Sequence, residues 1–213
     1  MKSAILILFL IPLLAACSST NTPVTQSNND LMPLAVGNQW TYHEWRTDST
    51  HILRPQEDFT ITLLSTSVRG GNTYYQSDLG ARYFYTSQGL WSETNGVLSP
   101  HFYAKHPVVL NEQMALDSVA ITDEQSPDPL DLAIGTQSLT GENVPYTTSS
   151  GTTYNTVQYR RTYRGTVHDS VYLVELQYFQ LGTGLVMHSY LAPDAAGTLQ
   201  TTEKWELANA TVK

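Results

Sequence analysis

The feature that most constrains the fold is an alternation of apolar and polar residues that begins near Leu31 and is repeatedly interrupted by Gly, Asn and Pro. In segment 58–68, for example, Phe59, Ile61 and Leu63 occupy every second position, which places them on one face of a β-strand. No segment shows the capped 3.6-residue apolar period of a helix. The pattern therefore predicts an all-β domain with little helix.

The connections between these runs are short, which favours antiparallel pairing of neighbouring strands. We therefore expect an antiparallel meander that forms a curved sheet, a half-barrel or a barrel. Asn95-Gly96 is a hairpin signal, and one short helix is predicted over 127–134, with Ser126 as its cap and Pro127 at its first position. The predicted strands are 58–68, 73–76, 81–86, 89–94, 153–163, 170–181, 185–191 and 199–207.

Two short sequence matches suggest an internal duplication. Segment 34–39 (LAVGNQ) resembles 132–137 (LAIGTQ), and Tyr83-Phe84 followed by Gly89-Leu90 resembles Tyr178-Phe179 followed by Gly184-Leu185. A single β-rich domain over 31–210 with two similar halves, 31–110 and 130–210, would account for both matches. Coincidence in a chain rich in Tyr, Thr and Gly is the alternative.

An acidic segment separates the two predicted halves. Residues 107–159 contain no Lys or Arg but seven carboxylates. Such a block repels itself and prefers solvent. We expect residues 111–129 to form a mobile acidic crossover between the halves.

The N-terminus has the pattern of a secretory signal. Met1-Lys2-Ser3 is basic, and the apolar run 4–14 is shorter than the roughly 20 residues that a membrane-spanning helix needs. The run ends in Leu14-Ala15-Ala16-Cys17, which resembles the lipobox of bacterial lipoproteins. The resemblance implies a signal peptide over 1–16, cleavage between Ala16 and Cys17, and acylation of Cys17. An ordinary secretory signal followed by a chance Cys is the alternative.

Residues 17–30 are expected to form the lipidated Cys and a flexible tether. The stretch after Cys17 is polar, with Val24 as its only large apolar residue, and cannot bury enough surface to fold. A chain of this length reaches roughly 20 Å. By analogy with Gram-negative sorting, Ser18 in place of Asp favours the outer membrane, and the absence of an acidic run after Cys17 favours the periplasmic side.

Composition excludes several classes of protein. The chain of 213 residues has 19 acidic and 11 basic residues and a formal net charge of −8, which argues against nucleic-acid binding because phosphates require a basic surface. One Cys rules out a disulfide framework, a thiolate zinc site and a Cys-x-x-Cys redox centre. We expect no cofactor.

The start of the predicted domain, 33–42 (PLAVGNQWTY), is similar to that of a group of uncharacterised bacterial envelope lipoproteins that begin Pro-Leu-x-x-Gly-Asn-x-Trp-x-Tyr. These proteins also have a Gly-Leu-Val turn before their last strands, as 184–186 here. The resemblance implies a β-rich periplasmic domain of the curved-sheet type found in lipoprotein carriers, without an established activity. We interpret the motif as architecture rather than chemistry; its residues are Pro33, Gly37, Asn38, Trp40, Tyr42, Gly184 and Leu185.

A search for catalytic and metal-binding motifs gives little. The sequence has no Gly-x-Ser-x-Gly, His-Glu-x-x-His or phosphate-binding loop, and its six His residues are scattered. No metal site is predicted. The weak candidate for a calcium site is an acidic group that lacks EF-hand spacing and for which a solvated loop is the favoured alternative: Asp123, Glu124, Asp128 and Asp131.

An aromatic group is the one candidate binding surface. Trp91, with Tyr83 and Tyr85 on the neighbouring strand and Tyr103 beyond, is a candidate stacking surface for sugars, lipid or peptide. Packing in the core or at a sheet edge is the alternative reading of the same residues.

The sequence thus favours a lipid-anchored cell-envelope protein that acts as a non-enzymatic binding or scaffolding module. Its partners would be the membrane, through acyl chains on Cys17, and a lipid, a glycan or an envelope protein. The first alternative is a carrier that shelters lipid or another apolar ligand in a half-barrel. A hydrolase of envelope glycan is a more remote alternative.

Overall fold

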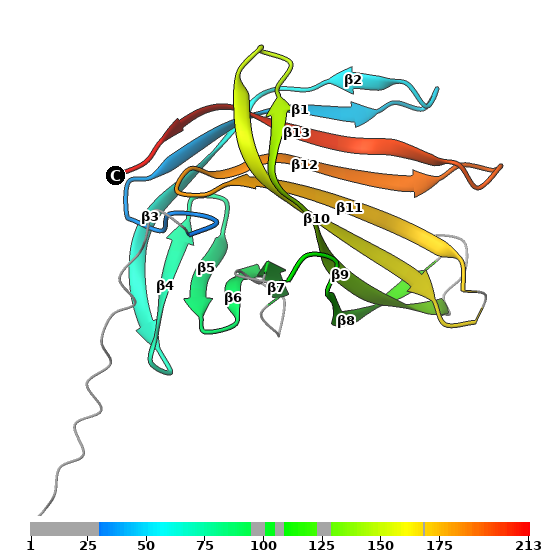
Figure 1. Ribbon diagram of the computed structural model, residues 1–213, viewed down its shortest axis with the longest axis horizontal. Helices are drawn as coiled ribbons and strands as arrows, with labels where there is room; N and C mark the ends of the chain where they lie inside the picture. The colour runs from blue at the N-terminus through cyan, green and yellow to red at the C-terminus, as the bar shows by residue number, and fades with distance from the viewer. Residues whose placement is uncertain (1–29, 95–100, 105–108, 123–128, 168) are drawn as a thin grey trace, which may run out of the picture.

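The computed structural model describes residues 30–94, 101–104, 109–122, 129–167 and 169–213 (Figure 1). Within these ranges the chain is built from strands, without a helix. The strands are β1 (Gln39–Thr47), β2 (Leu53–Pro55), β3 (Phe59–Arg69), β4 (Asn72–Ser77), β5 (Ala81–Thr86), β6 (Gly89–Thr94), β7 (His101–Ala104), β8 (Gln113–Thr122), β9 (Pro129–Thr147), β10 (Thr153–Gly165), β11 (Val171–Gln180), β12 (Gly184–Pro193) and β13 (Leu199–Thr211).

All thirteen strands belong to one antiparallel sheet with the order β7-β6-β5-β4-β3-β1-β13-β12-β11-β10-β9-β8, and β2 pairs with β1. Strand β1 lies between β3 and β13, so it joins the strands of the N-terminal part to those of the C-terminal part. The strands at the two ends of this order, β7 and β8, are not paired with each other in the described residues. The all-β fold and the antiparallel curved sheet are confirmed, and the sheet is open rather than closed into a barrel.

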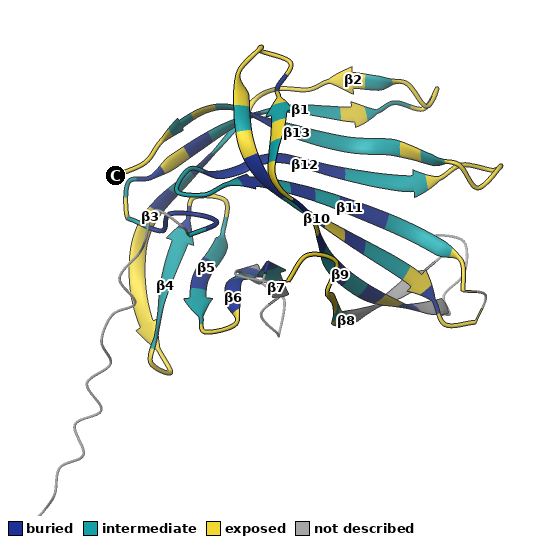
Figure 2. Cartoon of the chain, viewed as in Figure 1, coloured by how far each residue is buried: buried dark blue, intermediate teal, exposed yellow. Residues whose placement is uncertain are grey.

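One face of the curved sheet, which we call the inner face, holds the core. It receives Trp40 and Tyr42 from β1, Ile61 and Leu63 from β3, and Phe179 from β11, all of them buried. Figure 2 shows buried residues in the first part of β1 and β12, while most of β3 beyond Leu63 is exposed. The alternation in 58–68 thus has the consequence expected from its period, because a two-residue repeat directs one set of side chains to one face.

A chain of aromatic rings crosses the inner face from one part of the sheet to the other. Tyr83 of β5 meets Tyr103 of β7 edge to face at 6.2 Å between ring centroids. Tyr103 in turn meets Phe179 of β11 at 5.9 Å, and Phe179 meets Tyr159 of β10 at 5.9 Å. Edge-to-face pairs at such separations are favourable arrangements. These rings fill the space that the curvature encloses.

The helix predicted over 127–134 is wrong where the structure describes it. Residues 129–134 belong to β9, which pairs with β8 on one side and with β10 on the other. Local capping and proline signals are weak preferences, and tertiary pairing on both sides of a strand overrides them. The residues at the predicted start of this helix, Ser126 and Pro127, lie outside the described residues.

The acidic segment 111–129 differs from the expected crossover, because most of its described part is β8, an end strand of the sheet. The hairpin signal Asn95-Gly96 lies outside the described residues. Of the two sequence matches behind the duplication, one falls on similar hairpins, since Gly89 and Gly184 each begin a strand with positive φ. The other falls on unlike structure: 34–39 leads into β1, whereas 132–137 lies inside β9. The duplication stays a prediction.

Candidate functional site

The residues of the opening motif surround one buried amide, that of Asn38. Its Nδ2 donates to the carbonyl of Pro33 at 2.8 Å, and its Oδ1 accepts from the backbone N–H of Lys213 at 3.0 Å. Its backbone carbonyl accepts from the N–H of Leu63, and the N–H of Gly37 donates to the carbonyl of the same residue. Gly37 has a φ of +90°, a conformation that glycine adopts without strain. The motif therefore joins the start of the domain, β3 and the C-terminal end.

The same motif reaches the turn between β11 and β12. Trp40 Nε1 donates to the carbonyl of Thr183 at 2.6 Å, and the hydroxyl of Tyr42 donates to the carbonyl of Leu185 at 3.1 Å. A Cβ at Gly184 would lie 2.6 Å from Trp40 Nε1, so only glycine leaves room for the ring. The structure thus brings together two motifs that lie about 140 residues apart in the sequence, and their contacts are those of packing.

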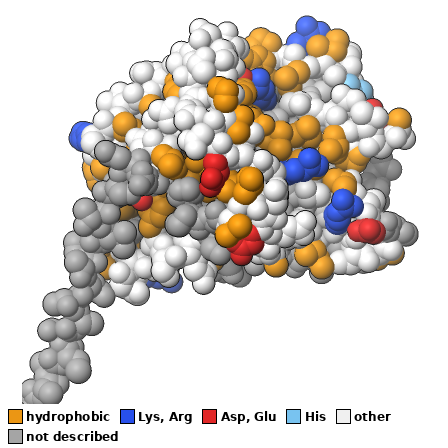
Figure 3. Space-filling view, viewed as in Figure 1, with side chains coloured by type: hydrophobic (Ala, Val, Ile, Leu, Met, Phe, Trp, Pro, Cys, Tyr) orange, Lys and Arg blue, Asp and Glu red, His pale blue; other side chains and the backbone are white. Residues whose placement is uncertain are grey.

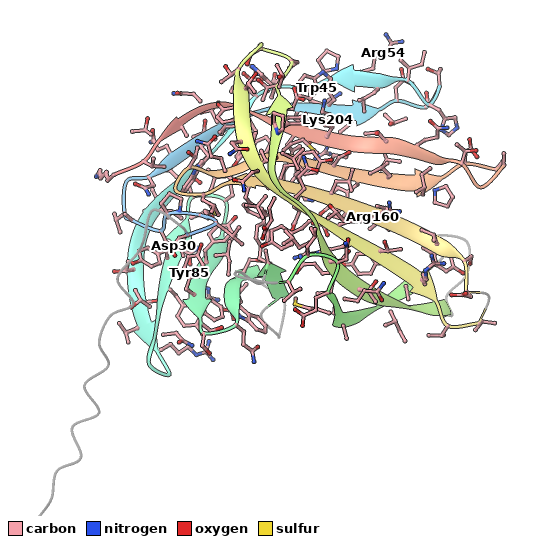
Figure 4. All side chains as sticks on the ribbon, viewed as in Figure 1. Asp30, Trp45, Arg54, Tyr85, Arg160 and Lys204 are labelled. Carbon is pink, nitrogen blue, oxygen red and sulfur yellow. The ribbon has the colours of Figure 1, made fainter. Side chains whose placement is uncertain are left out.

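The first described residues, Asp30 to Met32, are hydrogen-bonded to this part of the core. Leu31 and Met32 are buried. The backbone N–H of Met32 donates to the hydroxyl of Tyr85 at 2.8 Å, and this hydroxyl donates to the carbonyl of Met32 at 3.1 Å. The carbonyl of Asp30 accepts from the N–H of Gly182 at 2.8 Å. Figure 4 shows Asp30 and Tyr85 close together at one end of the sheet. Any force on the segment before Asp30 is therefore transmitted to the core.

Several predicted sites cannot be placed in the structure. The cleavage and lipidation residues Ala16 and Cys17 lie outside the described residues, as do Asp123, Glu124 and Asp128. Asp131 lies on β9. Among the described residues, no three His, Cys, Asp or Glu side chains are grouped so that they could hold a metal ion. The described part of the chain also contains no helix long and apolar enough to cross a membrane.

The predicted aromatic surface is divided between the two faces of the sheet. In the β5–β6 ladder Tyr83 pairs with Ser92, and Phe84 pairs with Trp91. Paired residues share a face and neighbours in a strand do not. Tyr83, Tyr85 and Tyr103 consequently belong to the inner face, whereas Trp91 stacks on Phe84 on the outer face, at 6.2 Å between ring centroids. The four residues do not form one stacking surface.

The inner face also holds a buried polar group that sequence reasoning missed. We call Arg161, Glu175, Gln177 and His188, from β10, β11 and β12, the inner cluster. Arg161 Nη1 donates to Glu175 Oε2 at 3.1 Å. The other carboxylate oxygen, Oε1, lies 2.8 Å from His188 Nε2 and accepts from Gln177 Nε2 at 2.8 Å. A second guanidinium nitrogen donates to the carbonyl of Tyr103 on β7. The cluster thus links three adjacent strands to an end strand of the sheet.

The surroundings of the inner cluster hold Glu175 in its charged form. Burial by itself raises the pKa of this carboxyl, but the charge of Arg161 and the hydrogen bonds from His188 and Arg161 outweigh burial and lower the pKa to about 2. The ring of His188 lies between Tyr190, at 4.5 Å, and Trp205, at 4.7 Å between centroids. Glu175 is therefore a poor proton donor near neutral pH.

A second buried glutamate lies on the opposite, outer face. The β9–β10 hairpin crosses over β11–β13, as Figure 1 shows, and its tip reaches Glu206 of β13. The hydroxyl of Tyr146 donates to Glu206 Oε1, the backbone N–H of Ser149 donates to Oε2 at 2.9 Å, and Lys204 Nζ lies 2.6 Å from Oε1. We call Tyr146, Ser149, Lys204 and Glu206 the outer clamp. It holds the long hairpin against the sheet.

The outer clamp extends to Trp45 of β1. Lys204 Nζ lies 5.4 Å from the centroid of the Trp45 ring, a separation typical of a cation–π contact. Figure 4 shows the two side chains next to each other above β13. Burial raises the pKa of Glu206, but hydrogen bonds from Lys204, Ser149 and Tyr146 outweigh it and lower the pKa to about 2.

Chemically, the inner cluster resembles the orienting half of a catalytic triad, in which a carboxylate holds an imidazole. The second ring nitrogen of His188, Nδ1, is buried and has no hydrogen-bond partner among the described residues. The carboxylate is already committed to Arg161 and Gln177. The arrangement joins strands, and in the described part of the chain no hydroxyl or thiol is hydrogen-bonded to Nδ1 of the imidazole. A signal for it did exist in the sequence, since Glu175 occupies the same alternation as Leu173 and Phe179.

Comparisons with known proteins add two distant structural likenesses. No protein-family model matches the sequence, and no curated protein matches it. One similar structure is that of a "putative exported protein with YmcC-like fold" from Bacteroides fragilis, with a TM-score of 0.45 and 9% identity over 84% of this chain and 98% of the other. Another is a "putative lipoprotein" from Parabacteroides distasonis, with a TM-score of 0.44 and 11% identity over 87% of this chain and 100% of the other. TM-scores below 0.5 at such identities do not assign a function to this chain.

Proposed function

We propose that the chain is a lipid-anchored protein of the bacterial cell envelope, held in the outer membrane on the periplasmic side. The observation that carries this proposal is the lipobox Leu14-Ala15-Ala16-Cys17 behind a short basic and apolar signal, with no second Cys in the chain. Acyl chains contribute about 0.8 kcal/mol for each buried CH₂, so two or three chains on Cys17 hold the protein at the membrane.

The fastening of the first described residues supports the same proposal. A protein that is attached through its N-terminus needs its domain to resist being pulled open from that end. Tyr85 and Gly182 bind the backbone of Met32 and Asp30, which precede the first strand. The segment at which the tether enters the domain, Asp30 to Met32, is thus part of the core.

We further propose that the domain acts as a non-enzymatic binding or scaffolding module. The inner cluster supports this role over the glycan hydrolase, because its carboxylate has a pKa of about 2 and three side-chain partners. The rings of Tyr103, Tyr159 and Phe179 support it over the carrier, since they occupy the inner face where an acyl chain would lie. Partners would then bind at the outer face or at a sheet edge.

The anchor is tested by replacing one atom. In cells fed labelled palmitate, the native chain should incorporate label and float with the outer membrane, whereas Cys17→Ser should incorporate none and remain a soluble or uncleaved form. A matched control, Ser18→Ala, keeps the cysteine and should still be labelled. Unlabelled native chain, or native chain recovered from the medium, would overturn the proposal.

The binding role is tested on the anchored protein itself. Crosslinking in intact cells followed by native mass spectrometry of the extracted complex should recover a partner protein or glycan at fixed stoichiometry. A phospholipid or fatty acid held inside the domain of Cys17→Ser would favour the carrier instead. Turnover of envelope glycan by the purified chain would favour the hydrolase.

A further inference from the structure

We propose that one exposed aliphatic patch of the domain rests on the lipid surface to which the acyl chains attach. The patch consists of Val36, Leu64, Leu79 and Val212, and we call it the tether-side patch. This inference rests on the proposed lipidation of Cys17 and deepens it, because it states which end of the domain faces the membrane.

Backbone hydrogen bonds place the four residues in one neighbourhood. The residue after Val36, Gly37, donates its N–H to the carbonyl of Leu63, which precedes Leu64. The residue before Leu79, Asp78, donates its N–H to the carbonyl of Thr62 and accepts from the N–H of the same residue at 2.9 Å. Leu64 and Leu79 are thus each within two residues of the hydrogen-bonded pair Thr62 and Asp78.

Val212 joins the same neighbourhood from the C-terminal end. The residue after it, Lys213, donates its backbone N–H to Asn38 Oδ1 at 3.0 Å, and its Nζ donates to the carbonyl of Val36 at 3.2 Å. The four side chains therefore come from four separate segments that converge at one end of the sheet. Such convergence differs from the scattered single apolar residues that any protein surface shows.

All four aliphatic side chains of the tether-side patch are exposed to solvent. The exposed fractions are 43% for Val36, 57% for Leu64, 58% for Leu79 and 37% for Val212. Exposed apolar side chains that gather at one end of a domain commonly mark a surface for another protein or for a membrane.

The position of the tether selects lipid as the occupant. Asp30, the first described residue, bonds to Gly182 at the same end of the sheet as the C-terminal end, while Arg54 and the β1–β2 turn lie at the opposite end (Figures 1 and 4). Twelve residues, and therefore thirteen Cα–Cα steps, separate Cys17 from Asp30. Even fully extended, they span at most about 45 Å, so the end with the patch is the end held near the bilayer.

The tether also explains why so small a patch suffices. A linked surface meets its target at an effective concentration on the order of millimolar, so contacts too weak to bind a free protein become populated. Lys213 and Asp78 flank the patch with opposite charges, so the patch does not require lipids of one particular charge. The surface is suited to a neutral or weakly charged lipid interface.

The test uses the full-length acylated protein in vesicles of phosphatidylethanolamine and phosphatidylglycerol. Since the chain has one Cys and acylation consumes its thiol, Leu79→Cys can be labelled there alone with an environment-sensitive fluorophore. Ile52→Cys is the matched control, because Ile52 is 49% exposed and lies in the β1–β2 turn. Lipids with quenching headgroups should quench the label at position 79 several-fold more than the label at position 52.

A second variant separates the patch from the anchor. A label at Val212→Cys should lose most of its quenching when Leu64→Asp and Leu79→Asp are added, while the protein still floats with the vesicles. Equal quenching at positions 79 and 52 in floating protein would overturn the patch and leave the anchor standing. If the label at position 79 were already shielded from water in detergent without vesicles, the patch would be assigned to a second copy of the chain. Failure to float would overturn the anchor and the patch together.

Discussion

Glu175 and Glu206, two of the glutamates that are buried in the described part of the chain, are held on opposite faces of the sheet by different partners. Glu175 on the inner face is neutralised by Arg161, whose side chain is 9% exposed. Glu206 on the outer face has Lys204 as its cation, 31% exposed, together with two neutral donors from the β9–β10 hairpin. Glu175 thus joins the body of the sheet, whereas Glu206 closes a hairpin over it.

The difference between Glu175 and Glu206 shows that the cost of removing a buried charge depends on the exposure of its cation. Removing one partner of a buried ion pair leaves an uncompensated charge, which costs more than the pair contributes. Where water can reach the remaining cation, the cost is smaller. On the outer face it is the cation, Lys204, that reaches solvent, while Glu206 itself is 2% exposed. Figure 3 shows a few Lys and Arg side chains among hydrophobic ones on the visible surface.

The largest effect is expected from Glu175→Gln. The amide keeps the shape of the side chain but leaves the guanidinium of Arg161 without a counter-charge, and the free energy of unfolding should fall by about 3–5 kcal/mol. Urea unfolding measures it. The control is Asp169→Asn, whose carboxylate lies 3.9 Å from Arg164 with side chains 90% and 54% exposed, and which should cost at most about 1 kcal/mol. Equal costs would remove the distinction between the two kinds of pair.

Acid should weaken the native protein by a comparable amount. The pKa of Glu175 is lowered to about 2, so its contribution is complete above the unfolded value of about 4.3 and is lost as the pH falls toward 2. A shift of this size corresponds to about 3 kcal/mol. Unfolding free energies at pH 7, 4 and 2.5 should fall more steeply for the native chain than for Glu175→Gln. Parallel curves would contradict an ionised Glu175 in the fold.

A smaller and more local effect is expected from Glu206→Gln. Hydrogen bonds to a charged group contribute about 1.5–3 kcal/mol, and the loss should fall mainly on the hairpin. Amide hydrogen exchange should rise over 141–153 in this variant, while exchange in β11 stays slow. If β11 and the hairpin exchanged together, the clamp would be part of the same cooperative unit as the inner cluster.

The smallest effect is expected from Tyr146→Phe. The ring keeps its edge-to-face contact with Tyr178 at 5.3 Å, and Glu206 keeps Ser149 and Lys204 as partners. One hydrogen bond is lost, at about 1 kcal/mol. Thermal unfolding of this variant beside Glu206→Gln checks the order. A larger loss than for Glu206→Gln would mean that the hydroxyl has a further role.

Much of the fold could be predicted because local patterns decide it. The two-residue period of Phe59, Ile61 and Leu63 places these residues on one face whatever the strand pairs with. The predicted helix at 127–134 failed for the converse reason. Its signals were local, whereas β9 is specified by neighbours on both sides, one of which is more than 20 residues away in the sequence.

The candidate sites could be predicted only in part. The grouping of Trp91 with Tyr83 failed as one surface because the face of a residue depends on its register, and neighbours in the ladder alternate. Glu175 was detectable as a charge in an apolar register, but its partners were not. Arg161 meets it through the β10–β11 register, and the His188 ring meets it from the next strand.

The sequence alone determined that this chain forms strands, where several of them end, and that it has the signal of a lipid-anchored protein. Turn chemistry, alternation and a lipobox are properties of adjacent residues. Only the tertiary structure decided that the sheet stays open, that two glutamates are buried on opposite faces, and that four aliphatic residues converge where Asp30 joins the core. The physical reason is that pairing register and curvature bring distant residues together, and neither can be predicted from a single segment.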